Sequence, residues 1–439
     1  MTIKKSRGAY WKNTPDISID SRTIKKGQVF VAIKGPNFDG HNFVARAFQK
    51  GASAAIVSRG VKAPARYRSR IVRVNDTVRA LGELARAHRM RFKIPVIAVT
   101  GSNGKTTTKD ILAHILSARY SVLKSEASYN NRIGVPLTLL KMRGRHEAVV
   151  LEIGMNRKGE IGMLARMAAP DIAIITNIGP AHLGPLKTLG NIFRAKRELL
   201  EALGRRGTAV LNKDDRFLRG LKNAGCKKVY FGIREKCAFR AVGARKSGSG
   251  WSFGVKGIGK IRLSSPGRHN IYNTLAAIAA SSLAGVSRGD IKKRVESFRM
   301  RSPKRLDLRV VAGRRVIDDT YNSNPASFKC ALELLESLQS HGKKIVVSGD
   351  MLELGAASRR LHAAAGEEIA GKDFDALITL GPLSRFTASA ARKKGLAFVR
   401  CASSHREAAK MLNSISERGD LVLIKGSRGM QMERVIDNL

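Results

Sequence analysis

The chain has 439 residues, 43% of them hydrophobic, and its 81 Lys and Arg against 34 Asp and Glu give a formal net charge of +47. This length suffices for about two to four domains with proper cores. No apolar stretch reaches the ~18 residues of a membrane span, and none follows the basic residues 1–7 as in a secretory signal. The four cysteines are widely spaced in the sequence and lack the spacing of metal ligands, so we expect reduced thiols. We therefore expect a cytoplasmic protein.

A basic balance of this size is also found in nucleic-acid-binding proteins, so its distribution matters. The excess of Lys and Arg runs through the whole chain, few aromatic residues are interleaved with it, and no basic tail appears. Such a surface favours the steering of anionic substrates, nucleotides included. We expect no specific nucleic-acid partner, although an ATP-driven nucleic-acid-binding protein stays an alternative of a different class.

The sequence divides into three zones, which we predict to be α/β domains at residues 1–92, 93–300 and 301–439. The first is a mixed segment with short apolar runs. In the second, continuously apolar runs alternate with helical stretches, which favours a parallel sheet covered on both faces. Its expected strands are 94–100, 148–153, 172–176, 208–211 and 229–231, followed by a hairpin within 242–262 and a helix over 273–283.

The third zone repeats the alternation of strand and helix. Its expected strands are 316–318, 344–348, 376–380, 397–400 and 421–425. This order predicts an open, doubly wound, Rossmann-like sheet. Because the zone lacks a glycine–lysine loop, we expect a nucleoside triphosphate to bind in the second zone instead.

A glycine-rich loop at residues 100–108, with the sequence TGSNGKTTT, lies between an apolar run and a helical stretch. This layout predicts a phosphate-binding loop, in which backbone N–H groups and a helix start receive phosphate oxygens. Lys105 would reach the terminal phosphates and the Thr106 hydroxyl would hold Mg²⁺. The usual pattern requires a glycine where Val99 stands, so a plain glycine turn stays an alternative here. The candidate ATP-binding residues of this loop are Thr100, Gly101, Ser102, Asn103, Gly104, Lys105, Thr106 and Thr107.

Polar residues that follow apolar strands are the next candidates. Glu152 ends one such run and His182 follows another. Because strand ends converge beside the phosphate loop, both side chains can meet a cation bound at Thr106. Lys196, by its residue pattern alone, reads as an exposed lysine of an amphipathic helix.

Two further segments, 267–273 and 318–325, are dense in side chains that form hydrogen bonds. Asn270 and Asn273 suit the edge of an adenine ring, and they suit turn capping equally well. The carboxylate of Asp319 could accept a ribose hydroxyl. The residue pattern alone leaves these alternatives open.

Together these motifs resemble those of the Mur ligases, the ATP-dependent ligases of bacterial cell-wall synthesis. The resemblance rests on TGSNGKTTT at 100–108, NIGPAH at 177–182, GRHN at 267–270 and DDTYNSNP at 318–325. Further similar segments are DSR at 20–22, GPNFDGH at 35–41, YNNRIGVP at 129–136, GDMLELG at 349–355 and LIKGSR at 423–428. The motifs follow the family's order through all three zones.

The resemblance implies a monomeric enzyme with an N-terminal UDP-binding domain, a central ATPase domain and a C-terminal Rossmann-like domain. It implies that ATP phosphorylates a carboxylate and that an amine then displaces the phosphate. An Asp-Asn-Pro-Arg motif, which in this family selects a diamino acid, is absent from the sequence. This absence favours members that join D-alanyl-D-alanine to UDP-N-acetylmuramoyl-tripeptide, with ATP and Mg²⁺ as cofactors.

The resemblance also implies roles for individual residues. Lys105 would contact the terminal phosphates, Thr106 and Glu152 would bind one Mg²⁺, and His182 would bind a second. Lys196 would bridge the two ions as a carbamate. This implied role replaces the interpretation of Lys196 as an exposed lysine. The implied adenine, phosphate and ribose contacts are Asn270, Asn273, Arg305 and Asp319. The implied substrate contacts are Ser21, Arg22, Asp39, Gly40, His41, Asn130, Asn131 and Arg132.

Alternatives within the same class are another Mur-type ligase and a folylpolyglutamate-type ligase. The UDP-type first zone argues against the folate enzyme. An inactive scaffold is a further alternative, against which the retained Lys105, Glu152 and His182 argue.

Overall fold

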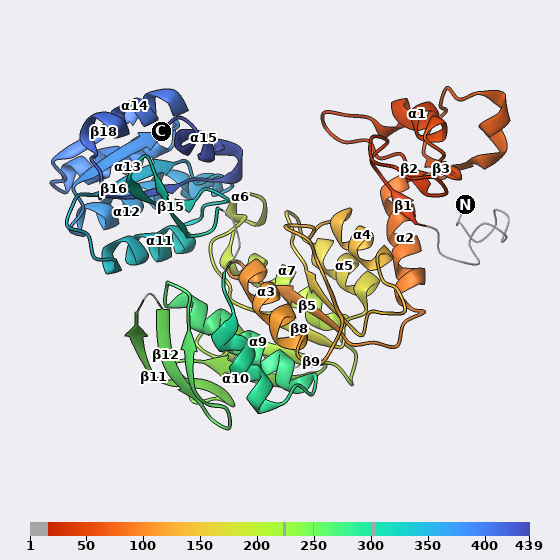
Figure 1. Ribbon diagram of the computed structural model, residues 1–439, viewed down its shortest axis with the longest axis horizontal. Coiled ribbons are helices and arrows are strands. Elements are labelled where there is room, and N and C mark those ends of the chain that lie inside the picture. The colour runs from red at the N-terminus through yellow and green to blue at the C-terminus, as the bar shows by residue number, and fades with distance from the viewer. Residues whose placement is uncertain (1–15, 223–224, 249, 301–303) are drawn as a thin grey trace.

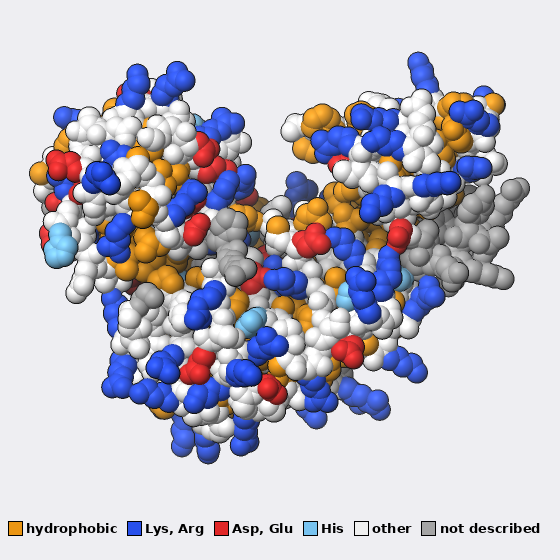
Figure 2. Space-filling view, in the orientation of Figure 1, with side chains coloured by type: hydrophobic (Ala, Val, Ile, Leu, Met, Phe, Trp, Pro, Cys, Tyr) orange, Lys and Arg blue, Asp and Glu red, His pale blue; other side chains and the backbone are white. Residues whose placement is uncertain are grey.

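The computed structural model describes residues 16–222, 225–248, 250–300 and 304–439, so the basic segment 1–7 lies outside the described residues. Three separate sheets define three lobes (Figure 1). We call these the first lobe (β1–β4), the central lobe (β5–β13) and the third lobe (β14–β19). Seen as in Figure 2, the face is hollowed between the first and third lobes, and Lys and Arg side chains are scattered over all three.

The first lobe is a parallel sheet in the order β1-β2-β3-β4. Its strands are β1 (Ile17–Ser18), β2 (Val29–Val31), β3 (Ala54–Val57) and β4 (Ile71–Arg73). The short helices are η2 (Gly40–Phe43), α1 (Val44–Gln49) and η3 (Ala65–Arg70). Because side chains alternate along a strand, Phe30 packs on the α1 side while Val29 and Val31 face α2 (Thr77–Arg89).

Helix α2 joins the first lobe to the central lobe. It begins where the Asp76 side chain accepts hydrogen bonds from the N–H groups of Val78 and Arg79. Its buried residues, Leu81 among them, share one hydrophobic core with the first sheet and with the central lobe. In Figure 1 the helix runs from the first lobe alongside α4 and α5.

The central lobe contains a sheet in the order β13-β12-β11-β10-β9-β8-β5-β7-β6, in which only β12 and β13 run antiparallel to their neighbours. Its strands are β5 (Val96–Thr100), β6 (Val122–Lys124), β7 (Ala148–Glu152), β8 (Ile172–Ile175), β9 (Thr208–Asn212), β10 (Lys227–Gly232), β11 (Phe239–Ser247), β12 (Gly250–Val255) and β13 (Gly259–Leu263).

Helices cover both faces of this sheet, which is why its inner strands are apolar without alternation. The helices are α3 (Lys105–Leu116), α4 (Gly134–Leu140), α5 (Glu160–Ala168), α6 (Leu183–Leu186), α7 (Leu189–Glu201), α8 (Arg216–Arg219), α9 (His269–Leu283) and α10 (Arg288–Ser297). One face packs against α4, α5 and α7, and the other packs against α3, α9 and α10.

The third lobe has the strand order β14-β15-β19-β16-β17-β18, in which only β14 is antiparallel. Its strands are β14 (Asp307–Val311), β15 (Arg314–Asp319), β16 (Lys344–Gly349), β17 (Ala376–Leu380), β18 (Phe398–Ala402) and β19 (Leu421–Lys425). Its helices are α11 (Pro325–Ser337), η4 (Gly355–Ala357), α12 (Ser358–Ala370), α13 (Ser384–Lys393), α14 (His405–Ile415), η5 (Arg428–Met430) and α15 (Glu433–Ile436). Helices α11–α13 cover one face of the sheet and α14–α15 cover the other.

The predicted α/β class and the doubly wound third zone are confirmed, and every strand predicted in the second and third zones is present within two residues. The sequence missed β6 and β14, which lie at sheet edges and are half-buried or exposed, so neither carries a continuous apolar run. The domain limits at residues 92 and 300 stay predictions. Among the residues described, no helix has the length and apolarity to cross a membrane.

Leu81→Ala should test the core shared by the first two lobes. Leu81 is fully buried, so we expect the free energy of unfolding to fall by about 3 kcal/mol. Leu308→Ala is the matched control, because Leu308 is 44% exposed on β14 and should cost less than about 1 kcal/mol. Urea unfolding followed by circular dichroism measures both. Equal losses would contradict this assignment of the core.

Candidate functional site

The loop between β5 and α3 brings the backbone unusually close to its neighbours. Gly101 has a φ of +150° and Gly104 a φ of +80°. A Cβ at Gly101 would lie 1.8 Å from Thr176 Oγ1, and one at Gly104 would lie 2.2 Å from Asn273 Oδ1. Only glycine fits both positions. The loop leads directly into the 12-residue helix α3, whose positive end is suited to a phosphate.

Two lysines converge on this loop. Lys105 Nζ donates to the carbonyl oxygen of Gly101 at 3.0 Å, and Lys196 Nζ donates to the same oxygen at 3.0 Å. Burial lowers the pKa of Lys105, an effect that Glu152 opposes and Arg305 reinforces. Burial, together with the charge of Lys105, holds the pKa of Lys196 well below its usual range. The loop therefore carries two amines that an anion would stabilise.

The interpretation of Lys196 as an exposed lysine is wrong, because its side chain is buried. The buried residues of α7 are Ile192, Ala195, Lys196, Leu199 and Leu200. Lys196 thus lies within the apolar stripe of the helix, a position that its spacing from Ile192 and Leu200 could have revealed.

Glu152 joins three segments of the site. The pairing of β5 with β7 sets Glu152 opposite Val99, directly before the loop. Its carboxylate accepts hydrogen bonds from Thr106 Oγ1 at 2.8 Å and from Asn130 Nδ2 at 2.8 Å. A threonine hydroxyl beside a buried carboxylate is the oxygen donor set that Mg²⁺ takes next to a nucleotide, so these residues fit that ion.

His182 contacts the third lobe. It follows β8, adopts a left-handed backbone with a φ of +60°, and donates from Nδ1 to Glu353 Oε2 at 2.6 Å. This hydrogen bond lowers the pKa of Glu353. Within the described ranges, no hydrogen bond joins His182 to Glu152 or Lys196, and no three His, Cys, Asp or Glu side chains form a metal-binding group. The two-ion arrangement therefore stays a prediction.

Asn270 and Asn273 lie on α9, behind the phosphate loop. Asn273 donates to Asn270 Oδ1 at 3.0 Å and accepts from Thr108 Oγ1 at 3.3 Å. Asn270 donates to Ser265 Oγ at 2.9 Å. Both side chains are buried. Asn273 contacts Thr108 and packs against Gly104 of the loop, and Asn270 holds Asn273 in place. Their contact with adenine stays a prediction.

Asp319 and Arg305 lie in the third lobe. Asp319 accepts from the buried Lys425 Nζ at 2.5 Å and from the N–H of Leu306 at 3.2 Å. The Arg305 guanidinium lies 3.7 Å from the ring centroid of Tyr321, a cation–π arrangement that fixes this arginine. The charge of Arg305 also contributes to the lowered pKa of Lys105.

The first lobe places its candidate residues after the ends of β1 and β2. His41 donates from Nδ1 to Asp39 at 2.6 Å and accepts at Nε2 from the N–H of Ser58 at 2.9 Å. Burial would raise the pKa of Asp39, but hydrogen bonds from His41 and Arg59 hold it at about 2. Gly40 passes so close to Ile33 that a Cβ would lie 2.7 Å from its nitrogen.

The remaining candidates of the first lobe and of the loop before α4 differ in exposure. Ser21 is buried, whereas the Arg22 side chain is 76% exposed and pairs with Asp20 at 2.7 Å. Asn131 and Arg132 are exposed, and Asn131 Oδ1 accepts from the N–H groups of Ile133 and Gly134 at the start of α4.

Three contributors were missed from the sequence. Lys109 is buried in α3 and donates to the carbonyls of Ser125 and Ala127, which fixes the loop that carries Asn130. Asn324 Nδ2 donates to Asn103 Oδ1 at 2.8 Å across two lobes, and Glu353 binds His182 in the same way. No spacing rule connects Asn324 or Glu353 with partners so far away in the chain, so only the three-dimensional fold could reveal these two contacts.

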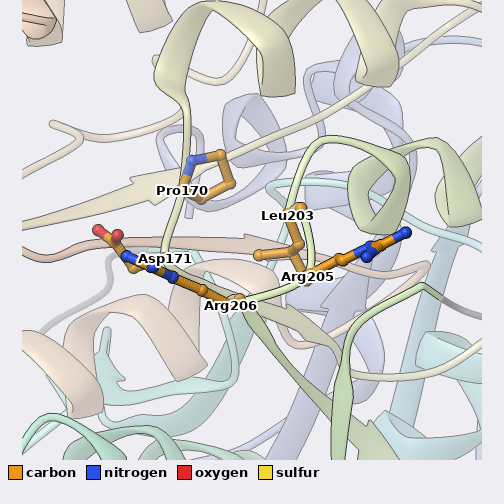
Figure 3. Close-up of a pocket in the computed structure, with 7 residues that line it drawn as sticks. Pro170, Asp171, Leu203, Arg205 and Arg206 are labelled. Carbon is orange, nitrogen blue, oxygen red and sulfur yellow. The ribbon is translucent and has the colours of Figure 1, made fainter.

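A cavity of about 340 Å³ lies at the opposite end of the central sheet. It is lined by residues before β8 and β9: Pro170, Asp171, Leu203, Gly204, Arg205, Arg206 and Gly207. Figure 3 shows the side chains of Arg205 and Arg206 extending in opposite directions, so they do not converge on one ligand. The phosphate loop, and not this cavity, is the candidate site.

The fold and the site define a three-lobed nucleotide-binding protein whose phosphate loop receives residues from the central and third lobes. Family models match along the chain: "Mur ligase family, catalytic domain" at residues 16–89, "Mur ligase middle domain" at 99–281, and "Mur ligase, glutamate ligase domain" at 304–428. The chain belongs to the Mur ligase family.

Curated relatives and solved structures match nearly the whole chain. The UDP-N-acetylmuramoyl-tripeptide–D-alanyl-D-alanine ligase of Bacillus subtilis is 37% identical, over 96% of this chain and 92% of its own length. MurF from Acinetobacter baumannii superposes with a TM-score of 0.87 at 34% identity, over 97% of this chain and 93% of that one. MurF from Thermotoga maritima, in complex with ADP, gives 0.85 at 30% identity over 97% of each chain.

Gly101→Ala should prevent nucleotide binding, because its Cβ would collide with Thr176 Oγ1. We expect the affinity for ATP to fall at least about tenfold, equivalent to about 1.4 kcal/mol, by isothermal titration calorimetry. Gly144→Ala is the matched control, since a Cβ there meets nothing within 4 Å. Wild-type affinity in Gly101→Ala would contradict the assignment of the phosphate loop.

Proposed function

We propose that this chain joins D-alanyl-D-alanine to UDP-N-acetylmuramoyl-tripeptide, with conversion of ATP to ADP and phosphate. The observation that carries the proposal is the match of all three lobes to ligases of that name, at up to 37% identity over 96% of the chain. The buried phosphate loop with Lys105, Lys196 and Glu152 gives this match a chemical basis.

The reaction has two steps, a phosphoryl transfer and an amide formation, and negative charge must be stabilised in both. A carboxylate oxygen of the tripeptide attacks the terminal phosphorus of ATP, and ADP leaves. The amine of the dipeptide then attacks the acyl carbon, and phosphate leaves as the amide forms. Lys105 and the N-terminal end of α3 are placed to stabilise the phosphates.

Mg²⁺ is the second part of the proposal. Thr106 and Glu152 would hold it, as their 2.8 Å contact suits. When bound, the ion would neutralise charge on the phosphates and orient them. His182 would bind a second ion, and Asn130 would keep Glu152 in place from the other side.

Lys196 is proposed to carry a carbamate. Lowering the pKa of the Lys196 amine enlarges its neutral fraction, and a neutral amine can attack carbon dioxide, losing a proton as the N–C bond forms. The product would be an anion beside the amine of Lys105, which shares the Gly101 carbonyl with Lys196. It would supply the oxygen ligands that the site otherwise lacks.

The remaining candidate residues would bind the substrates. In the first lobe, Ser21, Arg22, Asp39, Gly40 and His41 would bind the UDP group. Asn131 and Arg132 would contact the peptide at the start of α4. Asn270, Asn273, Arg305 and Asp319 would bind ATP. We further propose a cytoplasmic monomer with domains at 1–92, 93–300 and 301–439.

Purified protein with ATP, Mg²⁺ and UDP-N-acetylmuramoyl-tripeptide should release phosphate only when D-alanyl-D-alanine is added. A coupled phosphate assay and mass spectrometry of the UDP product measure this. Lys105→Ala should abolish turnover while UDP-substrate affinity persists, because the two sites lie on separate lobes. Equal turnover with single amino acids, or with a folate substrate, would refute the dipeptide assignment.

Isotope-labelled bicarbonate should give a carbamate signal in the carbon magnetic resonance spectrum of the wild-type protein, and the signal should be missing from Lys196→Ala. Lys187→Ala is the matched control, because Lys187 lies near α7 but is exposed, and it should keep the signal. We also expect Lys196→Ala to lose turnover at least about 100-fold. A wild-type spectrum without the signal, at saturating bicarbonate, would contradict the carbamate.

A further inference from the structure

We propose that Glu353 is a positioning residue for His182, so that His182 reaches its working orientation only when the third lobe docks on the loop after β8. The proposal rests on the proposed function, which gives His182 its role beside ATP. It adds a residue from another lobe, which couples the position of that lobe to the chemistry.

The contact between the two side chains fixes the imidazole. Glu353 Oε2 lies 2.6 Å from His182 Nδ1. An ionised carboxylate can only accept a hydrogen bond, so Nδ1 carries the proton and Nε2 keeps its lone pair. Carboxylates that hold a histidine in this way orient the ring and make its free nitrogen a better ligand. Glu353 performs this task from the third lobe.

The backbones of the two residues are joined as well. The N–H of Gly184 donates to the carbonyl oxygen of Glu353 at 2.7 Å. His182 has a φ of +60° and Glu353 a φ of +63°. Left-handed backbone is unfavourable for a residue with a side chain. Such strain is kept where the surrounding structure requires it, and here both strained residues meet each other across the junction.

Close packing makes the junction specific. A Cβ on Gly355 would lie 2.9 Å from the Cα of Gly184, and one on Gly184 would lie 3.3 Å from the carbonyl oxygen of Glu353. Leu183, between these contacts, packs against the cores of both the central and the third lobe. Figure 1 shows α6 at the junction of the two lobes. A small displacement of the third lobe would therefore break the contact with His182.

A second contact between the same lobes reaches the phosphate loop directly. Asn324, at the start of α11, donates from Nδ2 to Asn103 Oδ1 at 2.8 Å, while its own Oδ1 caps the helix by accepting from the N–H of Ser327. The third lobe thus touches the nucleotide loop and the His182 loop together. Docking engages both, and undocking releases both.

Two variants of Glu353 and one control variant test the proposal in the full-length protein. Glu353→Ala should lower kcat about 10- to 100-fold, with the KM for ATP changed less than about threefold, because it removes orientation and not nucleotide contacts. Glu353→Gln should restore most of kcat, since its amide oxygen can still accept the Nδ1 proton. Glu417→Gln is the control, an exposed carboxylate of the same lobe between α14 and β19, and it should match the wild type.

A second measurement, independent of turnover, is the solvent exchange of the Nδ1 proton of His182. In nitrogen-labelled histidine samples, the Nδ1 proton of His182 should be protected from exchange in the wild type and in Glu353→Gln, and should be lost in Glu353→Ala. Gly355→Ala should also lose it, because its Cβ separates the lobes. Gly395→Ala is the matched control, with a φ of +100° and nothing within 4 Å of its Cβ, and it should keep the signal.

The outcomes separate this inference from the proposed function. Wild-type kcat and a protected His182 proton in Glu353→Ala, in an active enzyme, would overturn the inference alone. Equal loss of kcat in Glu353→Ala and Glu353→Gln would overturn it too, because hydrogen-bond acceptance would then not be the role. A wild-type protein without ligase turnover but with the protected proton would refute the proposed function and leave the docking contact standing.

Discussion

The carbonyl oxygen of Gly101 is the acceptor on which the site depends, because two lysine amines share it. Lys105 and Lys196 come from different helices, and the positive φ of Gly101 is what turns this carbonyl towards both. Two amines so close in a buried place cannot both keep a full charge cheaply. The loop is therefore prepared for anions, and Glu152 is the buried carboxylate that faces it.

The two outer lobes are attached to this centre in different ways. The first lobe shares a continuous apolar core with the central lobe through α2. The third lobe meets the centre through hydrogen bonds at Asn103 and His182 and through Leu183, and it does not share one extended core with the centre. Apolar cores hold elements in one arrangement, whereas a few hydrogen bonds exchange readily with water. The junction beside the nucleotide is thus the one suited to opening and closing.

Much of the fold could be predicted from the sequence, because buried parallel strands leave long apolar runs such as 148–153 and 172–176. The phosphate loop and the proximity of Glu152 follow from strand ends that converge at one sheet edge. Lys196 was misread from its residue pattern, because a charged residue was assigned to the surface before its place on the apolar stripe was counted. The contacts of Asn324 and Glu353 could not be found, although both residues lie in motifs that the sequence shows, since their partners lie more than a hundred residues away in the chain.

The shared core around α2 also limits how the chain can be divided. A fragment that began after α2 would expose the side chains of α4 and α5 that now pack on Leu81 and its neighbours. A cut between α10 and β14 would instead part the third lobe at its contacts with Asn103, His182 and Leu183. The protein is therefore modular on one side only: the first and central lobes share one core, and the third lobe has cores of its own.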